Sequence, residues 1–198
     1  MPLKVSNKII DTFAKTLSII GHPLLVIPVF AIIALFKYEN TANATTLSAL
    51  IVGGLIVPVV AKMYLGYRKG TYSNFDVSDQ TERKTWYSLP IILLTIFTLY
   101  LFFTEQERNL RMAISLSLVL LISSKLINNS IKISLHASFG AYIAMLAFQL
   151  LGILYGWMFL LFALLVACAR VALARHTVLE VVLGLALGLI LGGFYLLA

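Results

Sequence analysis

Seven apolar segments occupy most of the chain, and their lengths restrict it to a fold built from membrane-spanning helices. Most approach the roughly 20 residues that a helix needs to cross a bilayer, and 61% of all residues are hydrophobic, far more than in soluble domains. We therefore expect an all-α fold, a polytopic integral membrane helical bundle of six or seven transmembrane helices, in a single domain over residues 1–198. The segments lie at residues 13–36, 47–67, 88–103, 110–127, 137–154, 157–174 and 177–197.

Two of these segments, 88–103 and 157–174, are short for a span, so each is either tilted or interfacial, or ends in a recess. Before the first span, Met1–Thr12 is predicted to be an amphipathic lead-in at the membrane surface. We expect no cleavable signal peptide, because the first apolar run is long enough to span and lacks a small-residue cleavage pattern.

The first span contains a histidine between a glycine and a proline. Pro23 and Pro28 should kink this helix or shift its start. His22 is either functional, as an ionisable group inside a membrane often is, or bonded to a backbone carbonyl that the kink frees. The second interpretation is the favoured one.

The charged residues suggest a membrane topology and a phosphate ligand rather than nucleic acid. The net charge is +7, but the basic residues are spread over several short loops without a continuous patch. The longest polar stretch, Arg68–Tyr87, carries both signs and is either an active-site lid or a solvated connector. Cys168 is the only cysteine, so neither an intrachain disulfide nor a cysteine-based metal site can form.

In a seven-span topology, three polar stretches fall on the same face of the membrane: Arg68–Tyr87, Lys125–His136 and Arg170–His176. The loops around Lys37, Glu105 and Tyr155 fall on the other face. Random scatter would not favour this convergence of histidines and cations, so we expect a pocket there. Its candidate lining residues are Arg83, Lys132, Arg170, His136 and His176.

This set of side chains suits phosphoryl transfer. Arginine and lysine hold a tetrahedral oxyanion and neutralise its developing charge, while one histidine attacks phosphorus and the other protonates the leaving alkoxide. Glu180 lies four residues after His176, so on a helix it can reach and orient that ring. We expect no metal, because zinc needs three or four ligands. Taken singly, each residue is more often a topology anchor or an interfacial side chain.

The spacing Arg170, five residues, His176, three residues, Glu180 resembles the third motif of the type-2 phosphatidate phosphatase superfamily, which includes the vanadium haloperoxidases. Ser134-Leu135-His136 resembles the second motif, and Asp79 to Arg83 resembles the first motif of a bacterial, membrane-embedded branch. The resemblance covers about residues 76–190.

The chain departs from the family pattern at several positions. The family's aspartate in motif three is Glu180 here, one methylene longer. When Arg83 is aligned with the arginine of the family's usual first motif, Asp76 falls where a lysine belongs, and Lys132 is a candidate for the missing cation.

The resemblance implies a metal-independent lipid phosphatase that needs no cofactor and works through a phosphohistidine. It implies His176 as the nucleophile, His136 as the general acid and Glu180 as the residue that orients His176. The implied substrates are phosphatidate, phosphatidylglycerophosphate, a polyprenyl phosphate or pyrophosphate, and lipid A. The phosphate-binding candidates are Arg170, Arg83, Lys132 and Ser134.

Two other functions are compatible with parts of the sequence. The departures in motifs one and two suit a degenerate, non-catalytic family member that binds or transports a phospholipid. A prenyl transferase is disfavoured, because that chemistry uses paired aspartate-rich Mg²⁺ sites and Asp76 with Asp79 offers one poor candidate. The expected partners are a lipid phosphate and the bilayer, with no nucleic acid, and the oligomeric state is left open.

The side of the membrane is predicted differently by two arguments. In the seven-span topology, the motif face carries twelve lysines and arginines and the other face three. The positive-inside rule then places the motif face in the cytoplasm, whereas the habit of the family implies the periplasmic side of a bacterial inner membrane. The charge excess favours the cytoplasmic side.

Overall fold

The computed structural model describes residues 8–197, and this part of the chain is built from helices without any β-strand. The first seven residues of the predicted surface lead-in thus lie outside the described residues. The elements are α1 (Lys8–Ile20), α2 (Pro23–Tyr38), α3 (Thr41–Ala49), the π-helical segment η1 (Leu50–Ile56), α4 (Val57–Arg68), α5 (Gln80–Trp86), α6 (Ser88–Phe103), α7 (Arg108–Ile127), α8 (Leu135–Leu150), α9 (Ile153–Ala172) and α10 (Val178–Leu197).

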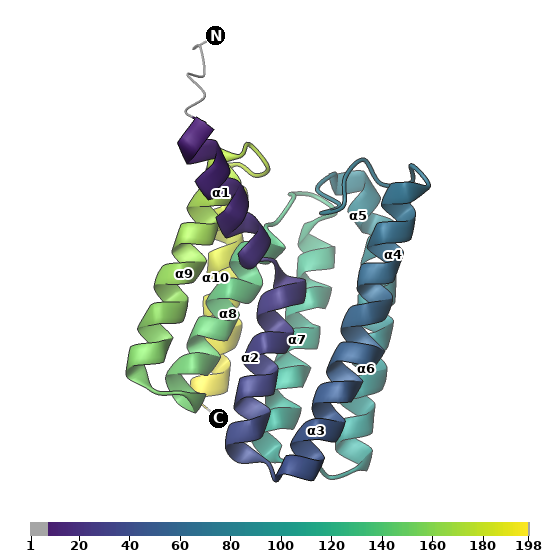
Figure 1. Cartoon of the computed structure of the whole chain (residues 1–198), viewed down its shortest axis with the longest axis vertical. Helices are drawn as coiled ribbons and strands as arrows, with labels where there is room; N and C mark the ends of the chain where they lie inside the picture. Colours follow the sequence, from purple (N-terminus) through teal and green to yellow (C-terminus); the bar gives the residue numbers. More distant parts are fainter. Residues whose placement is uncertain (1–7, 198) are drawn as a thin grey trace.

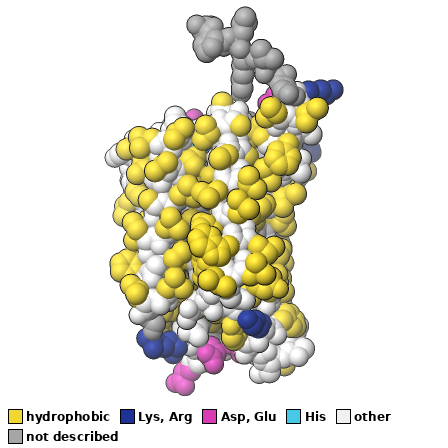
Figure 2. Space-filling view, turned by 90° about the vertical axis from the view of Figure 1, so that its left-hand side faces the viewer, with side chains coloured by type: hydrophobic (Ala, Val, Ile, Leu, Met, Phe, Trp, Pro, Cys, Tyr) yellow, Lys and Arg dark blue, Asp and Glu magenta, His cyan; other side chains and the backbone are white. Residues whose placement is uncertain are grey.

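The predicted polytopic helical bundle is confirmed. Within residues 8–197, five helical stretches are long and apolar enough to cross a membrane: Thr41–Arg68, Gln80–Phe103 and the helices α7, α9 and α10. The pair α1 and α2, bent by 50°, makes a sixth if it is counted as one span. Figure 2 shows apolar side chains covering the face of the molecule that it presents, as a lipid-facing surface requires.

Two predicted boundaries were wrong because side-chain caps start helices inside segments expected as loop. Asn40 accepts a hydrogen bond from Asn43 N at 2.9 Å, so a polar segment expected as loop begins α3. Asp79 caps α5 in the same way, and α5 continues into α6, so the span expected at 88–103 is 24 residues long. The other segment expected to be short, α9, has 20 residues.

The first span breaks where the proline predicts it. Helix α1 ends at Ile20, and α2 restarts with Pro23 in its first turn, where a missing N–H costs nothing. Pro28 lies inside α2. The break places His22 between the two helices, at the same end of the molecule as the polar loops.

Helix α8 is the centre of the bundle, although it is shorter than the spans around it. Eleven of its residues are buried, and it packs against α9 and α10 most closely and against α2 as well. Gly184, Gly188 and Gly192 of α10 make the close approach possible. A Cβ added at Gly188 would lie 2.1 Å from Ser138 O, and one at Gly184 would lie 2.7 Å from Ser134 O. The small residues of α10 thus allow its backbone to lie close to that of α8.

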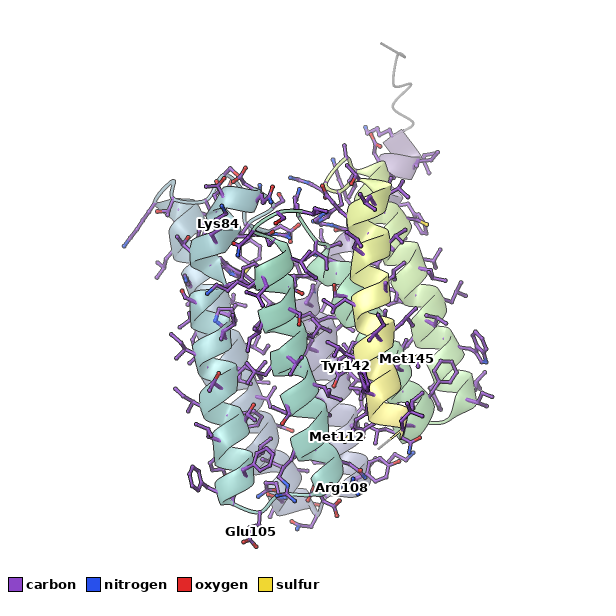
Figure 3. The ribbon with its side chains drawn as sticks, turned by 180° about the vertical axis from the view of Figure 1, so that it is seen from behind. Lys84, Glu105, Arg108, Met112, Tyr142 and Met145 are labelled. Atoms are coloured by element: carbon purple, nitrogen blue, oxygen red, sulfur yellow. The ribbon has the colours of Figure 1, made fainter. Side chains whose placement is uncertain are left out.

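Three loops gather at one end of the bundle: α4–α5, α7–α8 and α9–α10 (Figure 1). Figure 3 shows Lys84 of α5 at this end, and Glu105 and Arg108 at the opposite end. The three polar stretches predicted to share one face do so. The buried part of α8 begins at its first residue, next to these loops.

Candidate active site

The end of the α9–α10 loop holds a histidine and a carboxylate in contact. Thr177 Oγ1 accepts from Glu180 N at 3.3 Å, and Glu180 Oε2 accepts from Thr177 N at 3.4 Å, which is a capping box at the start of α10. The same Oε2 lies 2.7 Å from Nδ1 of His176. The carboxylate therefore both caps the helix and orients the ring.

The other ring nitrogen of this histidine is available. Nε2 of His176 is buried and has no hydrogen-bond partner among the described residues. Burial, reinforced by the positive charges of Arg83, Lys132 and Arg170, lowers the pKa of His176 to about 2. The ring is thus neutral at ordinary pH. Because Nδ1–H faces the carboxylate, the lone pair is on Nε2, as a nucleophile requires.

Arg170 lies at the end of α9 with its side chain almost completely buried. Its Nη1 donates to Ser18 Oγ at 2.7 Å, and its Nη2 donates to Asp76 Oδ2 at 2.5 Å. The predicted phosphate-binding guanidinium is therefore present in the site, but it is paired with a carboxylate. That carboxylate belongs to the residue that stands where the family pattern has a lysine.

His22 also contacts this carboxylate, although the sequence favoured a purely structural role for it. Its Nδ1 accepts a hydrogen bond from Leu24 N at 3.2 Å, so it caps α2. The interpretation that it bonds a freed carbonyl was wrong, because the ring accepts a backbone N–H instead. In the neutral ring the proton is then on Nε2, which lies 3.3 Å from Asp76 Oδ1. The sequence feature that could have indicated this capping role is the position of the histidine, directly before a proline that starts a helix.

His136 lies in the first turn of α8 and is buried. Its Nε2 is 4.0 Å from Asp76 Oδ1 and has no hydrogen-bond partner among the described residues. Its ring stands edge-on to that of His22, with 4.9 Å between centroids. Both histidines thus present Nε2 to the same carboxylate oxygen.

The carboxylate of Asp76 is the group that His22, His136 and Arg170 all face. Burial alone would raise its pKa, but the hydrogen bond from His22 and the positive charge of Arg170 outweigh burial and hold the pKa far below its usual range. The group is therefore an anion surrounded by donors. It stands where a bound phosphate oxygen would find the same donors.

One donor atom from each of His22, Asp76 and His136 lies within 4.8 Å of the others, so by distance alone the three side chains could hold a metal ion. The chemistry of the donor set argues against it. A ligating Nε2 needs a free lone pair, but in His22 the hydrogen bond that Nδ1 accepts from Leu24 N places the ring proton on Nε2. The geometry fits donation to an anion better than ligation of a cation.

The remaining predicted residues connect the loops. Arg83 is buried, and it donates from Nε to Val77 O and from Nη1 to Ile133 O, both at 2.8 Å. Lys132 Nζ donates to Arg175 O at 2.7 Å. Through these hydrogen bonds, Arg83 and Lys132 connect the loops that carry the motifs. Their positive charges also help to lower the pKa of His176.

Ser134 is the N-cap of α8. Its N–H donates to Glu180 O at 3.2 Å, and its Oγ accepts from Ala137 N at 3.5 Å. It holds the start of α8, and with it His136, against the start of α10. A helix N-terminus beside these cations also favours an anion.

All seven predicted site residues therefore lie at one end of the bundle, together with His22 and Asp76, which were not predicted. No family model, curated protein or solved structure matches the chain.

Proposed function

We propose that this protein is a membrane lipid phosphatase that hydrolyses a phosphomonoester or pyrophosphate of a lipid through a phosphohistidine, without a metal. One observation supports this above the others. The buried ring of His176 is neutral, and Glu180 holds it at Nδ1. The free Nε2 of His176 lies among the cations of the site.

In the first step, Nε2 of His176 attacks the phosphorus. A P–N bond forms, the P–O bond to the lipid breaks, and His136 gives a proton to the departing oxygen. In the second step, His136 takes a proton from water, which attacks the phosphohistidine and breaks the P–N bond. Inorganic phosphate and the dephosphorylated lipid are released, and Arg170 stabilises the charge on phosphorus in both steps.

The substrate phosphate has to take the place of the Asp76 carboxylate. Arg170 and His22 already donate to that carboxylate, so the same donors serve the phosphate when it enters. The carboxylate lies in the loop before α5, next to Val77, whose φ of +44° is strained for a β-branched residue. This strain favours release of the loop.

The test is phosphate release by the purified protein in detergent with EDTA, over a panel of lipid phosphates. We expect wild type to release phosphate and His176→Ala to release none. His136→Ala and Arg170→Ala should lose at least about 100-fold in rate. A rate in His176→Ala equal to that of wild type would disprove the proposal.

A second candidate function is supported by the same ion pair. Because Asp76 neutralises Arg170 and backbone carbonyls engage Arg83, the site also suits a non-catalytic protein that binds or transports a phospholipid. Lipid-phosphate binding without turnover, unchanged by His176→Ala, would favour this function.

A further inference from the structure

The site continues into an apolar cavity inside the bundle. His22, Asp76, Arg83 and His136 line one end of this first cavity, and the rest of its wall is almost entirely apolar, from α2, η1, α4, α6, α7 and α8. Figure 1 shows α2 in the middle, with α8 on one side and α4 and α6 on the other. The polar end of the cavity is thus the proposed catalytic end.

A second cavity lies directly beyond the first. It is bounded by α2, α7 and α8 and reaches Tyr38 and Glu107, close to the opposite end of the bundle. The side chains that line both cavities mark where they adjoin, and they are Ile27, Ala31, Ile114, Ser117 and Phe139. We call the two cavities together the tail chamber.

A third pocket adjoins the polar end of the first cavity. A pocket of about 530 Å³ lies on the other side of His22 and Asp76, lined by Lys15, Arg170 and Arg175 among others. Its volume is within the ~300–1,000 Å³ of small-molecule sites. His22 and Asp76 line both this pocket and the first cavity, so they lie where a cationic pocket meets an apolar chamber, as the junction between head group and tail requires.

The length of the tail chamber constrains its occupant. Along α2 it extends from His22 to Tyr38, sixteen residue steps or about 24 Å at ~1.5 Å per residue. One leaflet provides about 15 Å of hydrocarbon, half of the ~30 Å core. A chain that fills the chamber is therefore longer than one leaflet.

We propose that the tail chamber binds one hydrocarbon chain of the lipid phosphate inside the protein, and that this chain is longer than a single leaflet, of the isoprenoid or long alkyl class. This inference rests on the proposed function, because the chain is that of the lipid whose phosphate the site takes. The passage between Ala31 and Ser117, the two small side chains at the junction, then sets the selectivity for chain length.

The helix α7 offers a matched pair of variants. Ser117 lines the junction, and Ser115 lines neither cavity of the tail chamber, yet each hydroxyl donates to the carbonyl four residues earlier, at 2.9 Å and 2.7 Å respectively. Ser117→Phe should block the junction, whereas Ser115→Phe changes the same helix by the same volume outside it.

The first experiment compares decyl phosphate with a long polyprenyl phosphate. In Ser117→Phe, the ratio of kcat/KM for the long substrate to that for the short one should fall about tenfold relative to Ser115→Phe. Ala31→Leu should lower the ratio in the same direction from α2. Equal ratios in the two serine variants would overturn the tail chamber while leaving the phosphatase proposal intact.

The second experiment does not need turnover. Trp86 lines the first cavity, and the chain's other tryptophan, Trp157, is exposed on α9, so Trp157→Phe leaves one reporter. A long-chain alkyl phosphonate with bromine atoms on its chain should quench Trp86 saturably in nanodiscs. Ser117→Phe should weaken this binding about tenfold and Ser115→Phe should not.

This measurement separates the two proposals. If no protein hydrolyses any substrate, the phosphatase proposal fails, and the quenching alone then decides the tail chamber. Quenching that does not saturate, or that a brominated lipid without a phosphonate reproduces, would overturn it.

Discussion

Asp76 pairs with Arg170 across the site, and this one contact joins the loop before α5 to the end of α9. The carboxylate accepts from Nη2 of Arg170 at 2.5 Å and lies 3.3 Å from Nε2 of His22. An arginine that is buried needs an anion nearby. In this structure the protein itself supplies the anion, at the position that the proposed mechanism gives to the substrate phosphate.

Asp76→Asn should therefore strengthen anion binding. The amide has nearly the same shape but no charge, so inorganic phosphate no longer competes with an internal anion. We expect its Kd to fall about tenfold, about 1.4 kcal/mol. The measurement is the rise in Tm with phosphate concentration.

The matched control is Asp79→Asn. This residue is an acid of the same loop, but it caps α5, and asparagine caps a helix equally well. It should leave phosphate binding as in wild type. Equal affinities in both variants and wild type would show that the Asp76 carboxylate does not occupy the phosphate position.

The charge of Glu180 and its capping role can be separated. Glu180→Gln keeps a capping-box residue but removes the charge that orients His176, so kcat should fall about 100-fold or more with little change in Tm. Thr177→Ala does the reverse, since it removes the cap hydroxyl at a cost of about 1 kcal/mol and keeps the carboxylate. A larger loss of kcat in Thr177→Ala than in Glu180→Gln would contradict the orienting role.

The order of spans and the convergence of the motif loops could be predicted from the sequence, because both follow from apolar length and from the alternation of faces. The contact between His176 and Glu180 followed from their spacing of four residues. The capping box that Thr177 and Glu180 form could have been predicted from the same stretch of sequence, because a threonine followed three residues later by a glutamate is its signature.

The role of Asp76 could not be predicted in this way. Its partners His22 and Arg170 are 54 and 94 residues away in sequence, and only the packing of α2 and α9 around α8 brings them together. An aspartate in a charged loop looks like a solvated residue until those contacts are known. The tail chamber could not be predicted for the same reason. Its walls come from several helices that are far apart in the sequence, so no single segment indicates it.

Acid should destabilise the protein through His176. Its folded pKa is about 2, and its unfolded pKa is about 6.5, so below pH 6.5 the unfolded state binds a proton that the folded state does not. Stability is therefore lost as the pH falls, by about 2 kcal/mol between pH 7 and pH 5. Asp76 does not interfere, because its lowered pKa makes its contribution complete above about pH 5.

The measurement is Tm against pH in detergent for wild type and His176→Asn. The variant lacks the titrating ring, so its Tm should fall less between pH 7 and pH 5. Parallel curves for the two proteins would mean that the ring is not buried as a neutral group.

The packing of α10 on α8 predicts a sharp difference between two glycines five residues apart. A Cβ at Gly188 would lie 2.1 Å from Ser138 O, which is backbone and cannot rotate away, whereas a Cβ at Gly193 meets nothing within 4 Å. Gly188→Ala should push the helices apart and cost about 1–3 kcal/mol. Gly193→Ala should be neutral or slightly stabilising, since alanine is the better helix former. Ser134 and His136 lie at the start of α8, the helix that Gly188 contacts, so a displacement of α8 would move them. Gly188→Ala should therefore also lower activity at temperatures where the protein remains folded. An equal Tm in both variants would place the two helices further apart than in this structure.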